Sequence, residues 1–305
     1  MTSLDGRVAI VTGAGRGLGR EHALALAARG ASVIVNDLGV AGDGSGASLA
    51  PAEEVAAHIR DHLGGRAVVN GDDIAEEAGA EGVIAQALAE FGRLDIVVNN
   101  AGITRDRVLV NMSYDEWDSV VRVHLRGTFG VSRAAARHWR QVAKGGGTND
   151  ARIINTTSPS GLFGNGGQTN YGAAKGGIAT FTLAAARELV RYGVTVNAIS
   201  PVARTRMTEG LPGQVTPVEG EFDRMHPGNV SPLVVWLASA GSAHVNGRVF
   251  AIVGGRLSVA QGWQAGPALD REERWDPDEL GAAVSELLTA AGPLPNPNGR
   301  LPATS

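Results

Sequence analysis

The chain has 305 residues, of which 43% are hydrophobic and 19% charged, a balance typical of a soluble globular protein with enough apolar material for a large core. The net charge of -4 gives no electrostatic reason to expect nucleic acid or an anionic membrane as a partner. The chain has no cysteine, which excludes disulfides, thiol catalysis and cysteine metal sites. With neither a signal-peptide pattern nor an apolar run long enough to span a bilayer, we expect a cytoplasmic protein.

A glycine-rich turn follows the first apolar segment. Residues 8–11 predict a short strand, and residues 20–29 predict a helix after the turn Thr12-Gly-Ala-Gly-Arg-Gly-Leu-Gly19. Strand, glycine turn and helix are the context of a phosphate-binding loop, because glycine lets the backbone approach a pyrophosphate and the helix N-terminus offers free N–H groups. The spacing differs from G-x-G-x-x-G, so a tight turn between core elements is the alternative interpretation.

The second predicted strand, residues 31–36, ends at Asp37. A carboxylate at this place can accept hydrogen bonds from an adenosine ribose and would repel a 2′-phosphate. Asp37 therefore favours NAD over NADP, whereas Arg16 in the glycine turn weakly favours NADP.

A long glycine-rich loop over residues 39–50 leads into a helix that Pro51 opens. His58 and His62 stand four residues apart on this helix, which is a metal-ligand spacing. Because no third ligand accompanies them, we interpret the pair as part of a solvated helix face and predict no metal site.

Strands and helices continue to alternate along the chain. Further strands are predicted over residues 67–70, 94–98, 151–157, 194–199 and 248–253, and the segments 75–91, 117–139 and 176–191 have helical patterns. The alternation predicts an α/β fold, a Rossmann-type doubly wound, seven-stranded parallel sheet with helices on both faces. Residues 1–261 would form one dinucleotide-binding catalytic domain. We expect residues 262–305, with a short helix over 279–288 and a proline-rich, extended or disordered tail, to pack on that domain or on a neighbouring subunit.

Polar or glycine-rich residues follow most of these strands. In open α/β sheets, ligands bind at the carboxyl ends of the strands. The residues in such positions are Gly13–Gly19, Asp37, Asp73, Asn99, Ser158 and Pro201. Their common placement predicts one ligand site at one edge of the sheet.

Tyr171 and Lys175 lie one helical turn apart, thirteen residues after Ser158. On a helix they share a face, and an ammonium beside a phenol would favour phenolate and lower the tyrosine pKa. A surface Tyr and Lys at helical spacing is the alternative interpretation.

Four separated motifs together resemble the short-chain dehydrogenase/reductase family over about residues 5–255: Thr12-Gly-x-x-x-Gly-x-Gly19, Asn99-Asn-Ala-Gly102, Ser158 and Tyr171-x-x-x-Lys175. A narrower likeness is to the dehydrogenase unit of peroxisomal multifunctional enzymes of type 2, also described as 17β-hydroxysteroid dehydrogenase type 4, which oxidises (3R)-hydroxyacyl-CoA with NAD. The segments that carry this narrower likeness are 36–39, 99–107, 122–129 and Arg206-Met-Thr208.

The resemblance assigns roles to individual residues. It implies that Tyr171 is the general base or acid, that Lys175 holds the nicotinamide ribose, and that Ser158 binds the substrate oxygen. His124 stands where most family members have an Asn that supports a proton path, and a packed structural His is the alternative. The implied cofactor contacts are Gly13, Arg16, Gly17, Leu18, Gly19, Asp37, Asp73, Ile74, Asn99, Ala101, Gly102, Tyr171, Lys175, Pro201 and Thr205.

The resemblance implies an NAD-dependent oxidoreductase that interconverts a secondary alcohol and a ketone, on a 3-hydroxyacyl-CoA or a hydroxysteroid. One alternative is an NADPH-dependent 3-oxoacyl-thioester reductase, and another is a dinucleotide-binding regulator without turnover. Members of this family usually form dimers or tetramers, so the resemblance also implies a homodimer or homotetramer, formed through helices over residues 112–140 and 171–191. Pro201-Val202 replaces the family's usual Pro-Gly, so the contact with the nicotinamide amide is expected to differ in detail.

Overall fold

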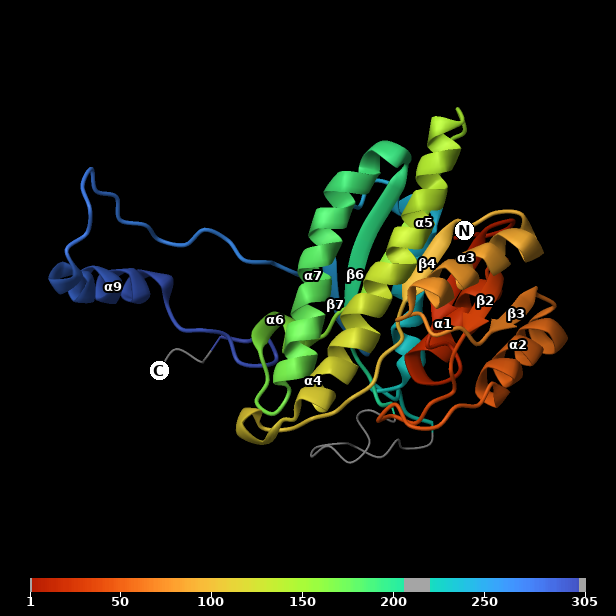
Figure 1. The fold of residues 1–305 in the computed structure, drawn as a ribbon, viewed down its shortest axis with the longest axis horizontal. Helices are drawn as coiled ribbons and strands as arrows, with labels where there is room; N and C mark the ends of the chain where they lie inside the picture. Colours follow the sequence, from red (N-terminus) through yellow and green to blue (C-terminus); the bar gives the residue numbers. More distant parts are fainter. Residues whose placement is uncertain (1, 206–219, 302–305) are drawn as a thin grey trace.

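The computed structural model describes residues 2–205 and 220–301, and an eight-stranded sheet organises them (Figure 1). The strand order is β3-β2-β1-β4-β5-β6-β7-β8. The strands are β1 (Val8–Thr12), β2 (Ser32–Asn36), β3 (Ala67–Asn70), β4 (Ile96–Asn99), β5 (Ala151–Thr156), β6 (Val194–Val202), β7 (Val249–Val253) and β8 (Arg256–Ala260).

The seven predicted parallel strands are all present, and the doubly wound α/β prediction is confirmed. The predicted number of strands is wrong, because β8 adds an eighth strand that runs antiparallel to β7. The two strands are joined at Gly254-Gly255, where Gly254 has a φ of +54°. A Gly-Gly pair between two apolar runs is a hairpin signal, and the sequence prediction read it only as the end of the seventh strand.

Helices cover both faces of the sheet. They are α1 (Gly17–Ala27), α2 (Ala50–Leu63), α3 (Glu77–Phe91), α4 (Tyr114–Val121), α5 (Gly127–Lys144), α6 (Pro159–Phe163), α7 (Thr169–Leu189), α8 (Ser231–Ala238) and α9 (Pro277–Ala291). A π-helical segment, Arg122–Arg126, joins α4 to α5 inside the stretch predicted as one helix. Short 3₁₀ turns occupy Leu109–Asn111, Val190–Tyr192, Pro227–Asn229 and Ala240–Ser242.

Two apolar cores lie on opposite faces of the sheet. Within β1, Ala9 and Val11 belong to the core under α1, α2 and α8, whereas Val8 and Ile10 belong to the core under α3, α5 and α7. Every residue of β1 is buried because a central parallel strand is covered on both sides.

The chain reverses its winding direction at β1. The strands β2 and β3 add to one side of β1, and β4 and its successors add to the other. In doubly wound sheets, the crevice at such a switch point, outside the carboxyl ends of the strands, is where ligands bind. The fold therefore places the predicted site between the loops that follow β1 and β4.

The C-terminal extension reaches away from the sheet, and α9 stands apart from the other helices (Figure 1). α9 contains no buried residue and is longer than the predicted helix over 279–288. The boundary between catalytic domain and extension at residue 261 stays a prediction. Within residues 2–205 and 220–301, no helix has the length and apolarity needed to cross a membrane.

Candidate active site

The glycine turn after β1 depends on glycine at specific places. Gly13 has a φ of +64°, and a Cβ on it would lie 2.7 Å from the Cα of Ala101. A Cβ on Gly19 would lie 2.1 Å from the carbonyl oxygen of Gly13. No other residue fits where two backbones approach this closely. The turn is thus packed against the loop after β4.

Helix α1 begins at Gly17 without a side-chain cap: Arg16, at the N-cap position, makes no capping hydrogen bond. The first N–H groups of a helix have no partner within it and favour an anion. These uncapped groups fit the pyrophosphate of a dinucleotide. Thr205, which follows β6, lies next to this helix start, because a Cβ on Gly17 would be 3.5 Å from its methyl carbon.

Asp37 lies immediately after β2 and beside the glycine turn, as predicted. Its Oδ2 accepts a hydrogen bond from the N–H of Gly15 at 2.7 Å, and its Oδ1 accepts one from the N–H of Gly39 at 2.6 Å. An ionised carboxylate has about four acceptor sites, so both oxygens keep capacity for ribose hydroxyls. The donor set fits an adenosine ribose.

A hydrogen-bond clamp that the sequence prediction missed joins the loops after β1 and β4. The Oγ1 of Thr12 accepts from the backbone N–H groups of Asn100 and Ala101, at 3.0 and 3.1 Å. In return, the Asn100 amide donates to the carbonyl oxygens of Thr12 and Gly13, at 3.0 and 3.1 Å. Thr12 and Asn100 were part of the quoted motifs, but their mutual bonding is not visible in the sequence.

Asn99 turns its side chain into the protein. Its amide donates to the Oγ of Ser132 at 2.9 Å and to the Oδ1 of Asn155 at 2.8 Å, and Asn155 donates to Thr182 at 2.9 Å. The network joins β4, α5, β5 and α7 in the buried interior. The side chain of Asn99 therefore braces the floor of the site, and a cofactor contact from this residue would come from its backbone.

The residues after β3 also lie at the carboxyl edge of the sheet. Asp73 accepts from the N–H of Ala75 at 2.9 Å and from the guanidinium of Arg122 at 2.6 Å. Arg122 also binds Glu76, at 2.7 Å. Ile74 is buried in the core under α3 and α5. Arg122, which the site prediction missed, thus links the loop after β3 to the π-helical segment.

Tyr171 and Lys175 lie one turn apart on α7, as predicted. The Nζ of Lys175 is buried, donates to the carbonyl oxygen of Thr156 at 2.6 Å and lies 5.7 Å from the centre of the Tyr171 ring. Ser158 follows β5, and its side chain caps α6 by accepting from the N–H of Ser160 at 3.2 Å. Ser158 also lies close enough to Tyr171 to lower the pKa of its phenol. The structure therefore brings Ser158, Tyr171 and Lys175 together at the carboxyl ends of the strands.

Burial controls the pKa values of this group. Desolvation raises the pKa of Tyr171 above its ordinary value, and the hydrogen bond with Ser158 offsets part of that rise. Desolvation lowers the pKa of Lys175 from 10.5 to about 7. The prediction that Lys175 lowers the tyrosine pKa is wrong for this state of the protein: part of the Tyr171 side chain stays accessible, but its phenol is surrounded closely enough for desolvation to dominate.

His124 lies against both the catalytic residues and the loop after β4. Its ring stands edge-on to Tyr171 with centroids 5.2 Å apart, and a Cβ on Gly102 would lie 2.2 Å from its Cε1. Nε2 accepts from the N–H of Ile103 at 3.1 Å or donates to its carbonyl oxygen at 2.7 Å, depending on the tautomer, while the buried Nδ1 has no hydrogen-bond partner among the described residues. Burial, and next the charge of Lys175, lowers the pKa of His124 to about 3, so its ring is neutral.

The remaining predicted cofactor residues fall on the same edge. Leu18 packs on the core under α1, and Arg16 is exposed at the rim. Pro201 lies within β6, opposite Ile252 of β7, so this strand is longer than predicted. The segment Arg206-Met-Thr208 lies outside the described residues. His58 and His62 stack on each other at 4.7 Å, and no cluster of three or more potential metal ligands occurs in the described part of the chain.

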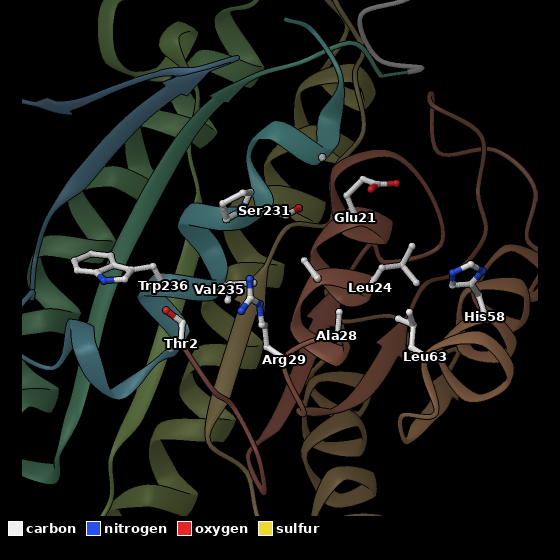
Figure 2. A pocket seen from close by; sticks show the side chains of 13 residues that line it. Thr2, Glu21, Leu24, Ala28, Arg29, His58, Leu63, Ser231, Val235 and Trp236 are labelled. Carbon is white, nitrogen blue, oxygen red and sulfur yellow. The ribbon is translucent and has the colours of Figure 1, made fainter. Parts of the chain in front are cut away.

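A cavity of about 570 Å³ lies elsewhere, between α1, α2, α8 and the N-terminal segment (Figure 2). Its walls are largely apolar, with Leu24, Ala28 and Trp236 among them, and Arg29 and His58 at its edge. None of the candidate catalytic residues lines it, so we do not assign the reaction to this cavity.

The sequence and the fold of this chain are similar to those of known proteins. The sequence profile described as short chain dehydrogenase matches residues 7–214. The chain belongs to the short-chain dehydrogenase family. Among solved structures, a short chain dehydrogenase from Mycobacterium avium superposes with a TM-score of 0.87 at 50% identity, covering 99% of both chains.

Curated relatives within the short-chain dehydrogenase family include named dehydrogenases and a reductase. The hydroxyacyl-CoA dehydrogenase ChsB1 of Mycobacterium tuberculosis is 46% identical over 96% of this chain and 92% of that protein. The peroxisomal multifunctional enzyme type 2 of Mus musculus is 47% identical over 82% of this chain and 32% of that protein. A 3-oxoacyl-[acyl-carrier-protein] reductase of Synechocystis is 38% identical over 84% of this chain and 99% of that protein.

Membership of the family confirms the enzyme class that the motifs predicted. The protein is an oxidoreductase that acts on a CH–OH group, and its family binds NAD or NADP.

Proposed function

We propose that the protein is an NAD-dependent 3-hydroxyacyl-CoA dehydrogenase in which Ser158, Tyr171 and Lys175 carry the catalysis. The observation that supports it most directly is the meeting of these three side chains beside a glycine turn at the switch point of the sheet. The likeness to a hydroxyacyl-CoA dehydrogenase along almost the whole chain supports the thioester substrate. A hydroxysteroid substrate, the other prediction, has no comparable support.

In this proposal Tyr171 moves the proton. Oxidation of a secondary alcohol requires loss of the hydroxyl proton, and the phenolate oxygen of Tyr171 takes it when the C=O bond forms. A bound NAD supplies the acceptor for the hydride from the same carbon. Ser158, which lies next to Tyr171, holds the substrate oxygen at the same place. Lys175, whose Nζ lies 5.7 Å from the centre of the Tyr171 ring, would hold the nicotinamide ribose beside it.

His124 would pass protons between Lys175 and the interior. Nε2 lies within hydrogen-bond distance of both the N–H and the carbonyl oxygen of Ile103, which leaves the buried Nδ1 without a partner among the described residues. The ring lies close enough to Lys175 for their charges to interact. A neutral imidazole can relay a proton without holding one, and a pKa of about 3 keeps it neutral at working pH. The π-helical segment that carries His124 is a type of distortion frequent at functional sites.

Asp37 supports NAD as the dinucleotide, since a 2′-phosphate would lie against a carboxylate. The competing function, an NADPH-dependent 3-oxoacyl-thioester reductase, is supported by the relative in Synechocystis and by the exposed Arg16 at the rim of the turn. Initial rates of 3-hydroxybutyryl-CoA oxidation with NAD and NADP, and of acetoacetyl-CoA reduction with NADH and NADPH, separate the two. A preference for NADPH would replace the first proposal by the second.

We also infer a homodimer or homotetramer. Large apolar side chains are exposed on α4, α5 and α7, among them Trp117, Phe129 and Leu183. Covering them with a second copy would remove apolar surface from water, which stabilises association. Sedimentation of the purified protein tests this inference. The cytoplasmic location stays a prediction.

Replacement of Tyr171 by Phe tests the catalytic assignment. The variant keeps the ring but loses the proton carrier, so kcat should fall by about a hundredfold to ten-thousandfold while NAD binds as before. Tyr114→Phe is the matched control, because Tyr114 is 89% exposed and its hydroxyl lies outside the site. A kcat of Tyr171→Phe close to that of the wild type would show that Tyr171 does not transfer the proton. If NAD binds but no hydroxyacyl-CoA is oxidised even by the wild type, the regulator without turnover becomes the better account.

A further inference from the structure

The C-terminal tail contains a hydrogen-bonded turn. The N–H of Asn296 donates to the carbonyl oxygen of Arg300 at 2.8 Å, and the N–H of Gly299 donates to the carbonyl oxygen of Asn296 at 2.8 Å. The side-chain oxygen of Asn296 also accepts from the N–H groups of Asn298 and Arg300, each at 3.0 Å. These four bonds fix the shape of the segment Asn296–Arg300, which we call the C-terminal turn.

The C-terminal turn returns from the distant α9 to the catalytic body and packs on α6 (Figure 1). A Cβ on Gly299 would lie 2.5 Å from Cε2 and 2.6 Å from Cζ of Phe163. The backbone of Gly299 therefore rests directly on the end of the Phe163 ring. Gly299 also has a φ of +74°, so its conformation favours glycine independently of this contact.

Helix α6 lies between the catalytic helix and the C-terminal turn. On one side, a Cβ on Gly161 would lie 2.6 Å from the Cβ of Lys175, so α6 and α7 pack backbone to backbone. On the other side, Phe163 contacts Gly299. The helix has five residues and starts directly after Ser158, which caps it. A substrate held at Ser158 that extends past α6 on this side would meet Phe163 and the C-terminal turn.

We propose that the C-terminal turn forms the outer wall of the substrate site and that its contact with Phe163 selects the apolar part of the acyl group. This inference rests on the proposed hydroxyacyl-CoA function. The turn is flanked by Leu294 and Leu301, which are 83% and 67% exposed, and Phe163 is half-buried. Apolar side chains around a site bind apolar ligand atoms, so the chemistry of this wall suits a long or bulky hydrocarbon acyl chain.

Two glycine variants isolate the contact. Gly292 and Gly299 have nearly equal φ angles, +73° and +74°, but a Cβ on Gly292 would meet no atom within 4 Å. Gly292→Ala therefore places a side chain at a positive φ in the same C-terminal segment without a collision with Phe163. The full-length wild type and both variants are assayed with NAD and two substrates, 3-hydroxybutyryl-CoA and 3-hydroxydodecanoyl-CoA.

We expect Gly299→Ala alone to raise KM for 3-hydroxydodecanoyl-CoA by about tenfold, since losing contact with each methylene costs about fourfold in affinity. KM for 3-hydroxybutyryl-CoA and for NAD should stay unchanged, because neither reaches the wall. An equal rise for both thioesters, no rise for either, or the same rise in Gly292→Ala would overturn the inference.

Hydrogen exchange separates failure of this inference from failure of the proposed function. Dodecanoyl-CoA, which cannot react, should slow exchange in residues 159–164 and 294–301 of the wild type, whereas CoA alone should not. The same protection should be lost in Gly299→Ala. If no thioester is oxidised but dodecanoyl-CoA still slows exchange in both segments, the proposed function is wrong and the inference that the C-terminal turn contacts the acyl chain is supported. If dodecanoyl-CoA protects neither segment, the wall is refuted.

Discussion

The buried amine of Lys175 should make the stability of the protein depend on pH in a calculable way. Its pKa falls from 10.5 to about 7 in the folded chain because burial disfavours the charged form. Below pH 7 both the folded and the unfolded chain hold the proton, and the folded state bears the whole desolvation cost. As pH rises above 7, the folded chain releases the proton while the unfolded chain keeps it, so stability rises.

The slope follows from the shift. Well between the two pKa values each pH unit adds about 1.4 kcal/mol to the free energy of unfolding, and because the amine is half-protonated at pH 7 its gain between pH 7 and pH 9 is about 2 kcal/mol. In Lys175→Met this contribution is absent. The variant also leaves the carbonyl oxygen of Thr156 without its donor, but that loss is the same at every pH and leaves the slope untouched.

Urea unfolding at pH 7 and pH 9 measures the effect. Lys175→Met should gain less stability than the wild type over this range, by about 2 kcal/mol. The chain offers a matched control, because Lys144 is its only other lysine and lies exposed at the end of α5. Lys144→Met should run parallel to the wild type. Equal slopes for the wild type and Lys175→Met would show that Lys175 titrates near its ordinary value and would refute the reasoning.

Three further changes test other parts of the site. Gly19→Ala places a Cβ 2.1 Å from the carbonyl oxygen of Gly13; it should lower the free energy of unfolding by about 1–3 kcal/mol and weaken NAD binding, as measured by urea unfolding and fluorescence titration. Asp37→Ala should raise KM for NAD about tenfold or more and reduce the preference for NAD over NADP, since it removes hydrogen bonds to a charged acceptor. His124→Phe should lower kcat, and His124→Asn should have a kcat between those of His124→Phe and the wild type. The pH profile of kcat for His124→Asn should keep both wild-type limbs, because the pKa of His124 is about 3. Loss of a limb near neutral pH in His124→Asn would contradict this.

Much of the fold could be predicted because its signals are local. A parallel strand buried on both faces reads as a short β-branched run, and the helices between such runs fix the layers. The sequence prediction missed the strand β8, Arg256–Ala260, because it lies at the edge of the sheet and most of its residues are exposed. An exposed antiparallel edge strand has no continuous apolar run to reveal it. The signal that could have found it was the turn itself.

The site was less predictable where it depends on burial and on contacts across the chain. The Ser158, Tyr171 and Lys175 set followed from spacing and resemblance. The raised pKa of Tyr171 did not, because it depends on how closely the folded chain surrounds the phenol. The clamp between Thr12 and Asn100 joins residues 88 positions apart, and nothing in either local sequence shows that they meet.

Asp37 links the choice of dinucleotide to the architecture of the site. Its two oxygens already hold the backbone of Gly15 in the phosphate-binding turn and of Gly39 at the start of the long loop. A Cβ on Gly15 would come within 2.9 Å of both this carboxylate and Pro51 of α2, so the space around it is full. A change that admits a 2′-phosphate must therefore remove the charge without losing the two acceptors. In Asp37→Asn, the amide offers one carbonyl acceptor for the two N–H donors of Gly15 and Gly39. The variant would therefore lose the hydrogen bond to one of the two loops while it accepts NADP more readily. Under the proposed function, cofactor preference and loop order therefore depend on the same carboxylate.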